Sequence, residues 1–154
     1  MIDKNRERLN QLLEKRSKKL ENVLHFQEHF QNFKYYLSEI IETINTEISN
    51  KTNEHLMLFA DNPYKNSDSR FFAMVQLFLL GHRRNAFLLD NSENNPLIEF
   101  KGDEFTGNVR YTIIFGDNII LNEECPITQL LDKDIIFEII LNFLDIIYNS
   151  QTIK

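Results

Sequence analysis

The sequence has little cysteine, proline or glycine and no tryptophan. Its 154 residues include one cysteine, Cys125, with three prolines and four glycines. A single cysteine excludes a disulfide within the chain. The first proline is Pro63 and the first glycine is Gly81, so residues 3–49 contain no strong helix breaker. The first third of the chain can therefore form one unbroken helix.

Long apolar runs are also missing. No uninterrupted stretch of about 18 apolar residues occurs, so we expect no membrane span. No charged-then-apolar leader is visible at the start, and the expected compartment is the cytoplasm. Hydrophobic residues still make up 42% of the chain and include thirteen phenylalanines, enough to build a core. We therefore expect one domain, with or without an extended arm.

Charge is unevenly distributed along the chain, whose formal net charge is −6. Residues 1–20 carry seven Lys or Arg against three Asp or Glu, and residues 101–154 carry four against nine. An acidic chain is a poor general ligand for nucleic acid, because phosphate contacts need a concentrated cationic surface. Only the N-terminal segment could supply such a surface.

Apolar side chains recur with heptad spacing between residues 9 and 48. The seam is interrupted at Arg16 and Lys19 and is continuous from residue 23 to residue 44. A helix of this length spans roughly 70 Å, about twice the diameter of a hundred-residue domain. A domain of that size leaves part of the apolar seam uncovered. A second copy of the chain in a coiled coil is the simplest partner to cover it. The residues predicted to form this oligomerisation seam are Val23, Phe26, Phe30, Phe33, Leu37, Ile40 and Ile44.

Aromatic residues qualify the coiled-coil interpretation. Phe26, Phe30 and Phe33 are bulky for a two-stranded seam and suit packing against a sheet equally well. We therefore expect the first half of the helix to be an arm and the second half to pack against the globular part. The alternative is a break into two antiparallel helices near residues 45–54.

Short apolar runs follow residue 52, separated by turn-prone segments. They predict strands at 54–60, 71–80, 85–90, 96–100, 108–115 and 118–121, although residues 69–81 also fit a helix. Residues 132–149 predict a helix that is apolar around most of its circumference and hence buried on more than one side. The predicted fold class is α+β: a long N-terminal helix, an antiparallel meander of four to six strands, and a C-terminal apolar helix packed on the sheet. The predicted division places an oligomerisation arm at 1–50 and the sheet with its helix at 53–154.

The stretch GHRR at 81–84 is the most chemistry-like spot in the chain. Arg83 and Arg84 could grip a phosphate or carboxylate with paired hydrogen bonds. No Gly-rich loop that enters a helix accompanies them, and Gly at the tip of a hairpin explains the stretch equally. We interpret it as a turn.

Two other features suggest chemistry without its usual context. The segment HFQEH at 25–29 matches H-x-x-E-H and superficially resembles the zinc motif of pitrilysin-type metallopeptidases. The rest of that pattern is missing, and a third ligand would have to come from elsewhere, such as Glu104 or His55. Cys125 follows Glu123 and Glu124, whose charges raise a thiol pKa, so we expect a structural thiol and not a nucleophile.

These observations predict a non-enzymatic protein-interaction or scaffolding subunit without cofactor or metal. It is expected to self-associate, as a dimer, or to join a larger complex through its N-terminal and C-terminal helices. One alternative is an accessory subunit that contacts nucleic acid through the basic arm. Another is an antitoxin-type or immunity-type inhibitor whose acidic surface blocks a basic enzyme. The candidate anion or nucleic-acid contacts are Lys15, Arg16, Lys18, Lys19, Arg83 and Arg84.

Overall fold

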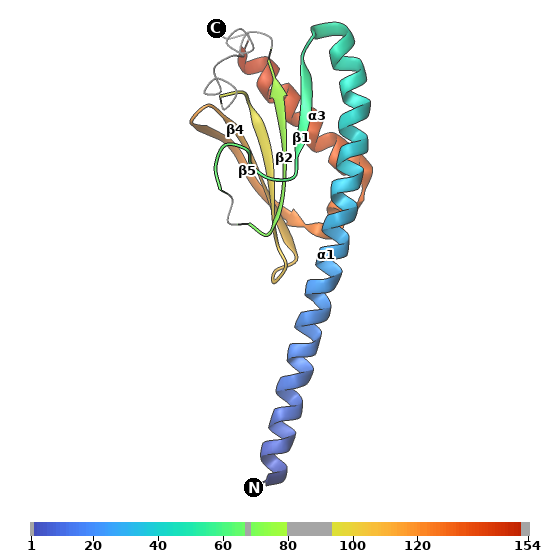
Figure 1. The fold of residues 1–154 in the computed structure, drawn as a ribbon, viewed down its shortest axis with the longest axis vertical. Helices are drawn as coiled ribbons and strands as arrows, with labels where there is room; N and C mark the ends of the chain where they lie inside the picture. The colour runs from blue at the N-terminus through green and yellow to red at the C-terminus, as the bar shows by residue number, and fades with distance from the viewer. Residues whose placement is uncertain (1, 67–68, 80–93, 152–154) are drawn as a thin grey trace.

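The computed structural model describes residues 2–66, 69–79 and 94–151. A long helix, five strands and a C-terminal helix follow one another along the chain, which confirms the predicted α+β class (Figure 1). Helix α1 runs without a break to the end of its range, so the alternative of two antiparallel helices is wrong. The elements are α1 (Ile2–Thr52), β1 (His55–Phe59), β2 (Phe71–Phe78), β3 (Leu97–Asp103), β4 (Asn108–Phe115), β5 (Asn118–Pro126), the 3-10 helix η2 (Ile127–Leu131) and α3 (Lys133–Gln151).

The five strands form an antiparallel meander in the order β1-β2-β3-β4-β5. Residues 71–78, which could have been strand or helix, are strand β2, and β2 pairs with β1 and β3. A register shift between Ile113 and Ile114 marks an irregularity in the pairing of β4 with β5. The predicted strand at 85–90 and the GHRR turn at 81–84 lie outside the described residues.

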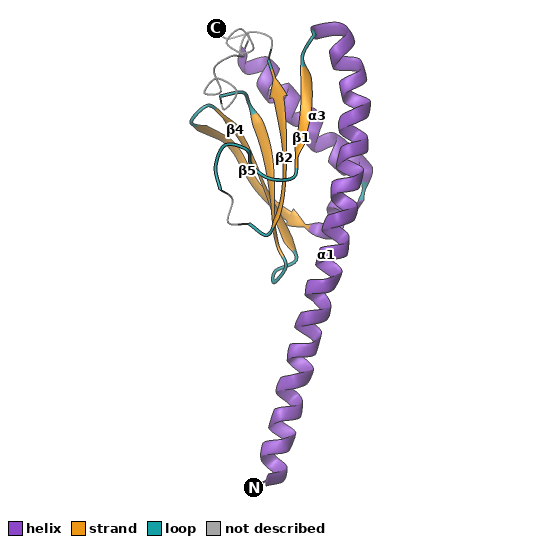
Figure 2. Cartoon of the chain, in the orientation of Figure 1, coloured by secondary structure: helices purple, strands orange, loops and turns teal. Residues whose placement is uncertain are grey.

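The main core lies between one face of the sheet and a helical layer made of α1, η2 and α3 (Figure 2). Alternate strand residues face this layer, as expected for a sheet with one buried face. Phe33 of α1 is fully buried and packs edge-on against Phe100 of β3, with ring centroids 5.1 Å apart. Phe26 packs in the same way against Phe71 of β2 at 5.0 Å. The phenylalanines that were bulky for a coiled coil therefore pack on the sheet.

Gly102 of β3 explains how a phenylalanine of α1 can approach the sheet so closely. A Cβ atom at this position would lie 2.7 Å from Cζ of Phe26 and 3.0 Å from Cβ of Phe71. The absence of a side chain at Gly102 makes room for the Phe26 ring. The contact fixes the point at which α1 meets the body.

A side chain in the last part of α1 holds the first strand. The Asn45 Nδ2 atom donates a hydrogen bond to the Leu56 carbonyl oxygen at 2.8 Å, and the Leu56 N–H donates to Asn45 Oδ1 at 2.6 Å. Asn45 thus satisfies both backbone groups of one residue of the edge strand β1. Two such bonds fix the position of β1 against α1.

Helix α3 is covered on two sides by the chain itself. Ile136, Ile140 and Phe143 are fully buried in the main core, and α3 contacts both α1 and η2. Its residues Asp134, Glu138, Asn142, Asp145 and Asn149 are exposed along one stripe, as the sequence predicts. No helix in the part of the chain that the structure describes is both long enough and apolar enough to span a membrane.

The opposite face of the sheet carries a smaller apolar cluster formed by Phe72, Met74 and Leu97. Tyr64, in the segment between β1 and β2, packs against this cluster. Its hydroxyl lies 2.6 Å from Oε1 of the buried Gln76, to which it donates a hydrogen bond. The β1–β2 connection thereby closes over part of the outer face.

Candidate interaction surface

The first 21 described residues of α1 project from the rest of the molecule (Figure 1). Every residue from 2 to 22 is exposed, and Phe26 is the first buried residue of the helix. We call residues 2–22 the arm and the remainder of the fold the body. Most helical stability in proteins comes from packing of an apolar face, and the arm packs its apolar residues against no other part of the described chain. The arm is therefore the part of the molecule for which a partner has most to contribute.

The seven residues predicted to form the oligomerisation seam lie mostly inside the body. Six of them are buried in the main core, and Val23 is half-buried at the base of the arm. Their side chains already contact the chain's own sheet and α3, so a second chain cannot reach them in this conformation. Association between chains would have to use other residues. The buried six are Phe26, Phe30, Phe33, Leu37, Ile40 and Ile44.

The arm carries a different apolar stripe, which the sequence prediction missed. Its members are spaced by seven or four residues and are all exposed. An α-helix turns by about 100° per residue, which places these side chains within roughly 60° of one another. We call the following residues the arm stripe: Ile2, Leu9, Leu13, Leu20 and Leu24.

The arm stripe does not continue the face of α1 that packs on the body. At about 100° per residue, its centre lies roughly one third of a turn away from the centre of the buried residues between Phe26 and Ile44. The heptad register starting at Leu9 joined the two faces into one seam and so placed Arg16 and Lys19 on it. The signal that separates them is an eleven-residue repeat, Ile2 to Leu13 to Leu24 and Leu9 to Leu20, which is typical of a nearly straight helical seam.

Charged side chains border the arm stripe on both sides. On one side lie four acidic residues, which we call the acidic flank: Asp3, Glu7, Glu14 and Glu21. On the other side lie four basic residues, which we call the basic flank: Arg8, Lys15, Arg16 and Lys19. Both flanks are exposed throughout. The arm thus carries an apolar stripe, interrupted by Arg6, with an acidic flank on one side and, on the other, a basic flank that also contains the exposed Leu12.

The candidate nucleic-acid contacts do not gather on one face. Lys15, Arg16, Lys18 and Lys19 are exposed on the arm, and they spread over roughly 160° of the helix circumference. Arg83 and Arg84 lie outside the described residues. No compact basic patch is formed by the four residues that can be placed, and a patch is what phosphate binding favours.

The HFQEH segment lies at the base of the arm. His25 and His29 border a hollow of about 260 Å³ that Glu104 and Phe105 of the β3–β4 turn also line. The structure thus brings the predicted third ligand Glu104 to the same hollow as the two histidines. Within residues 2–66, 69–79 and 94–151, however, no three His, Cys, Asp or Glu side chains are grouped closely enough to hold a metal ion.

A second hollow lies on the outer face of the sheet. Tyr64, Leu97, Glu99 and Asp117 are among the residues that line its volume of about 190 Å³. Ligand pockets usually enclose about 300 to 1,000 Å³. These two hollows are smaller than that range and give no geometric support to a bound substrate.

Cys125 lies near the end of β5 and is half-buried. Burial raises the pKa of its thiol, and the charges of Glu123 and Glu124 raise the same pKa further. A raised pKa lowers the fraction of thiolate, which is the nucleophilic form. The environment is that of a structural thiol, as the sequence predicts.

The comparisons with known proteins add no relative to these observations. No family model, no curated protein and no solved structure matches the chain.

Proposed function

We propose that this protein is a non-enzymatic assembly subunit that binds a second protein chain through the arm of α1. The single observation that carries the proposal is the exposed arm stripe, which the body leaves uncovered. Burying a large apolar side chain contributes roughly 1.5–3 kcal/mol. A partner helix laid along five such residues would therefore gain much of its binding energy from this stripe.

The arrangement of the two apolar faces of α1 supports this function. The body-facing residues are buried within the chain and stabilise the fold, whereas the arm stripe points about a third of a turn away from them. A partner can contact the arm stripe without displacing the body from the helix. Folding and assembly therefore use separate faces of one helix.

Two leucines of nearly equal exposure allow the proposal to be tested. Leu20 of the arm is 47% exposed and Leu141 of α3 is 46% exposed. Light scattering should give the unmodified chain twice the 18.4 kDa mass of one copy. Leu20→Glu should weaken association on the order of a hundredfold, because it places a charge in an apolar seam, whereas Leu141→Glu should leave it unchanged.

Two results would overturn the proposal. In the first, the full-length protein remains monomeric at high concentration, and every chain that it retrieves is also retrieved by Leu20→Glu. The other is association that is lost in Leu141→Glu and retained in Leu20→Glu, which would assign the contact to α3. Circular dichroism of each variant separates loss of association from loss of folding, because the body contributes its own helix and sheet signal.

Contact with nucleic acid is the second candidate, and the excess of basic residues on the arm favours it. Replacement of Lys15, Lys18 and Lys19 by Gln should then abolish a binding that weakens steeply with salt. Leu20→Glu should leave such binding intact. Under the assembly proposal, Leu20→Glu is the variant that loses the partner chain.

A further inference from the structure

The charge pattern beside the arm stripe carries information about the partner. We infer that the occupant of the arm stripe is the arm of a second copy of this chain, lying parallel to the first. The inference rests on the proposed assembly function and specifies its partner and orientation. The two bodies then lie at one end of the paired helices and the two N-termini at the other.

Acidic and basic side chains occupy opposite sides of the arm stripe. Glu7, Glu14 and Glu21 recur every seven residues, so they stay on one side of the arm stripe over its whole length. Arg8, Lys15 and Lys19 lie on the other side. Residues that border the apolar seam of paired helices form the ion pairs that set partner choice and orientation.

Symmetry then decides between the two ways of pairing identical helices. In a parallel pair related by a two-fold axis along the helices, the acidic flank of each helix faces the basic flank of the other. In an antiparallel pair, where the two-fold axis is perpendicular to the helices, the acidic flank faces the acidic flank and the basic flank faces the basic flank. Like charges held together are destabilising, so the pattern selects the parallel pair.

Length and space are compatible with this arrangement. The arm stripe extends from Ile2 to Leu24, which covers two eleven-residue repeats of the helix. Beyond it, Gln27 and Gln31 of α1 continue the same side of the helix and are exposed. The side of α1 that would face a parallel partner is thus open where the body begins.

The orientation is tested with single cysteines at two positions of the same face. Arg6 and Gln27 are exposed, and at about 100° per residue both lie within the sector of roughly 60° that the arm stripe occupies. In full-length protein with Cys125→Ser, Arg6→Cys and Gln27→Cys are prepared separately and then mixed in a glutathione redox buffer. Mass spectrometry of the cross-linked products identifies which positions have joined.

The parallel pair predicts disulfides between two copies of Arg6→Cys and between two copies of Gln27→Cys. The antiparallel pair holds two copies of either position far apart, so a dimeric mass with neither of these disulfides would overturn the orientation. Disulfide exchange balances in both cases, since each new bond between two thiols is coupled to reduction of one molecule of oxidised glutathione to two thiols. No cross-linked product, together with a monomeric mass, would refute self-pairing. The assembly function itself fails only if this monomer also retrieves no partner chain whose binding depends on Leu20, so the two failures are distinguishable.

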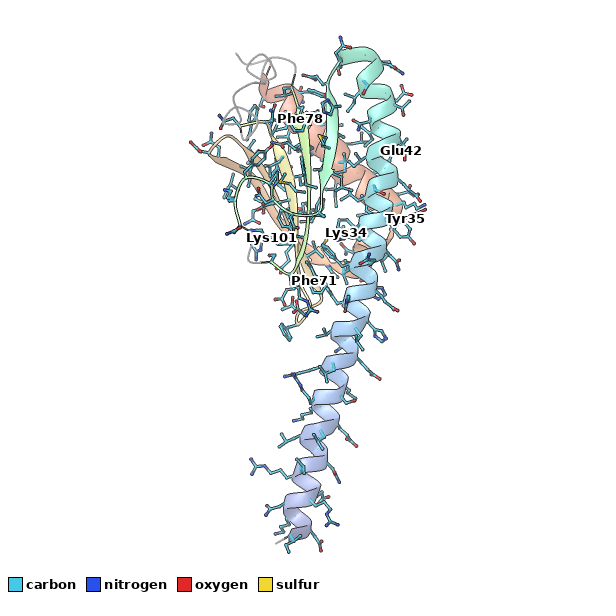
Figure 3. All side chains as sticks on the ribbon, viewed as in Figure 1. Lys34, Tyr35, Glu42, Phe71, Phe78 and Lys101 are labelled. Carbon is cyan, nitrogen blue, oxygen red and sulfur yellow. The ribbon has the colours of Figure 1, made fainter. Side chains whose placement is uncertain are left out.

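Charge reversal tests the physical cause. The triple variant Glu7→Lys, Glu14→Lys, Glu21→Lys should weaken self-association on the order of tenfold or more, because basic flanks then face each other. The opposite triple variant, Arg8→Glu, Lys15→Glu, Lys19→Glu, should weaken it similarly, and a mixture of the two should restore pairing. Glu42→Lys, at an exposed position of the body half of α1, is the control and should change nothing (Figure 3).

Unchanged self-association of the acidic-flank triple variant would contradict the inference, because only an antiparallel or charge-independent pair tolerates it. Binding of the monomeric protein to vesicles of anionic lipid would also contradict the inference. An amphipathic helix can use an apolar stripe with basic residues to bind such a surface instead of a second copy.

Discussion

Residues 2–22 and residues 23–52 belong to one helix, yet they have opposite surroundings. In the second half, phenylalanines, leucine and isoleucines pack against the sheet and α3, and the helix is part of the core. In the first half the leucines are exposed, and the helix projects from the body (Figure 1). Equal secondary structure therefore does not imply an equal role. The body half stabilises the fold, and the arm presents a surface.

The comparison also shows how one helix can serve two contacts. The two apolar faces of α1 are rotated by roughly a third of a turn. If they were continuous, a partner on the arm would be aimed at the surface that the body already occupies. Under the proposed assembly function, rotation of the arm stripe would place a partner beside the body.

The largest expected effect contrasts a core residue of the body half with a stripe residue of the arm. Phe33→Ala should lower the free energy of unfolding by about 3–5 kcal/mol, because it leaves a cavity against Phe100. Leu13→Ala should leave the unfolding of the body unchanged at low protein concentration, where the arm is unpaired. Urea denaturation followed by circular dichroism measures both, and similar losses in the two variants would contradict the division of α1.

An intermediate effect is expected from two asparagines of the same helix. Asn45→Ala removes both hydrogen bonds to Leu56 and should cost about 1–3 kcal/mol of unfolding free energy, because backbone groups of β1 lose their partner. Asn22→Ala, at an exposed arm position, is the matched control and should cost little. Hydrogen exchange at the Leu56 amide should accelerate in Asn45→Ala alone.

The smallest expected effect concerns the ionisation of two tyrosines, and it is measurable only at alkaline pH. Burial and the neighbouring Glu123 carboxylate raise the pKa of Tyr111 to about 12, and burial with the charge of Glu54 raises the pKa of Tyr148 to about 12. The unfolded chain loses these protons near pH 10. The stabilisation from the two neutral hydroxyls is therefore complete below pH 10 and is lost as the pH rises from 10 toward 12.

Alkaline titration of tyrosine reports on the body alone, because the arm contains no tyrosine. Absorbance of tyrosinate should show late ionisation in the native protein, and Tyr111→Phe should remove one late group. The body should unfold over the same pH range as this late ionisation. Titration of all five tyrosines near pH 10 in the folded protein would contradict the buried environments of Tyr111 and Tyr148.

The local pattern of the amino-acid sequence predicted more of the fold than of the exposed apolar surface. The lack of glycine and proline before residue 63 predicted the continuous helix, and alternating apolar runs predicted the strands of the meander. The apolar circumference of residues 132–149 predicted burial on two sides, which α1 and the sheet provide. These features depend on neighbours in sequence, so periodicity reveals them.

The seam was assigned to the wrong surroundings for a physical reason. Phe26, Phe30 and Phe33 form an apolar stripe on a helix whether a second helix or a sheet covers them. Periodicity records only that the face is buried, and not what buries it. The site at Gly102, where the ring of Phe26 meets β3 across 76 residues of chain, exists only once the sheet has formed.

The sequence by itself determined the long helix, the antiparallel meander and the two-sided C-terminal helix, because each follows from the spacing of apolar residues. Adjacent charges predicted the direction of the Cys125 pKa shift, but its largest cause is burial, which the tertiary structure supplies. Only the tertiary structure decided where α1 leaves the body, and hence which apolar residues are core and which remain exposed. The reason is that burial is a property of distant contacts: the sheet is long enough to cover α1 from Phe26 onward and does not reach the leucines of the arm.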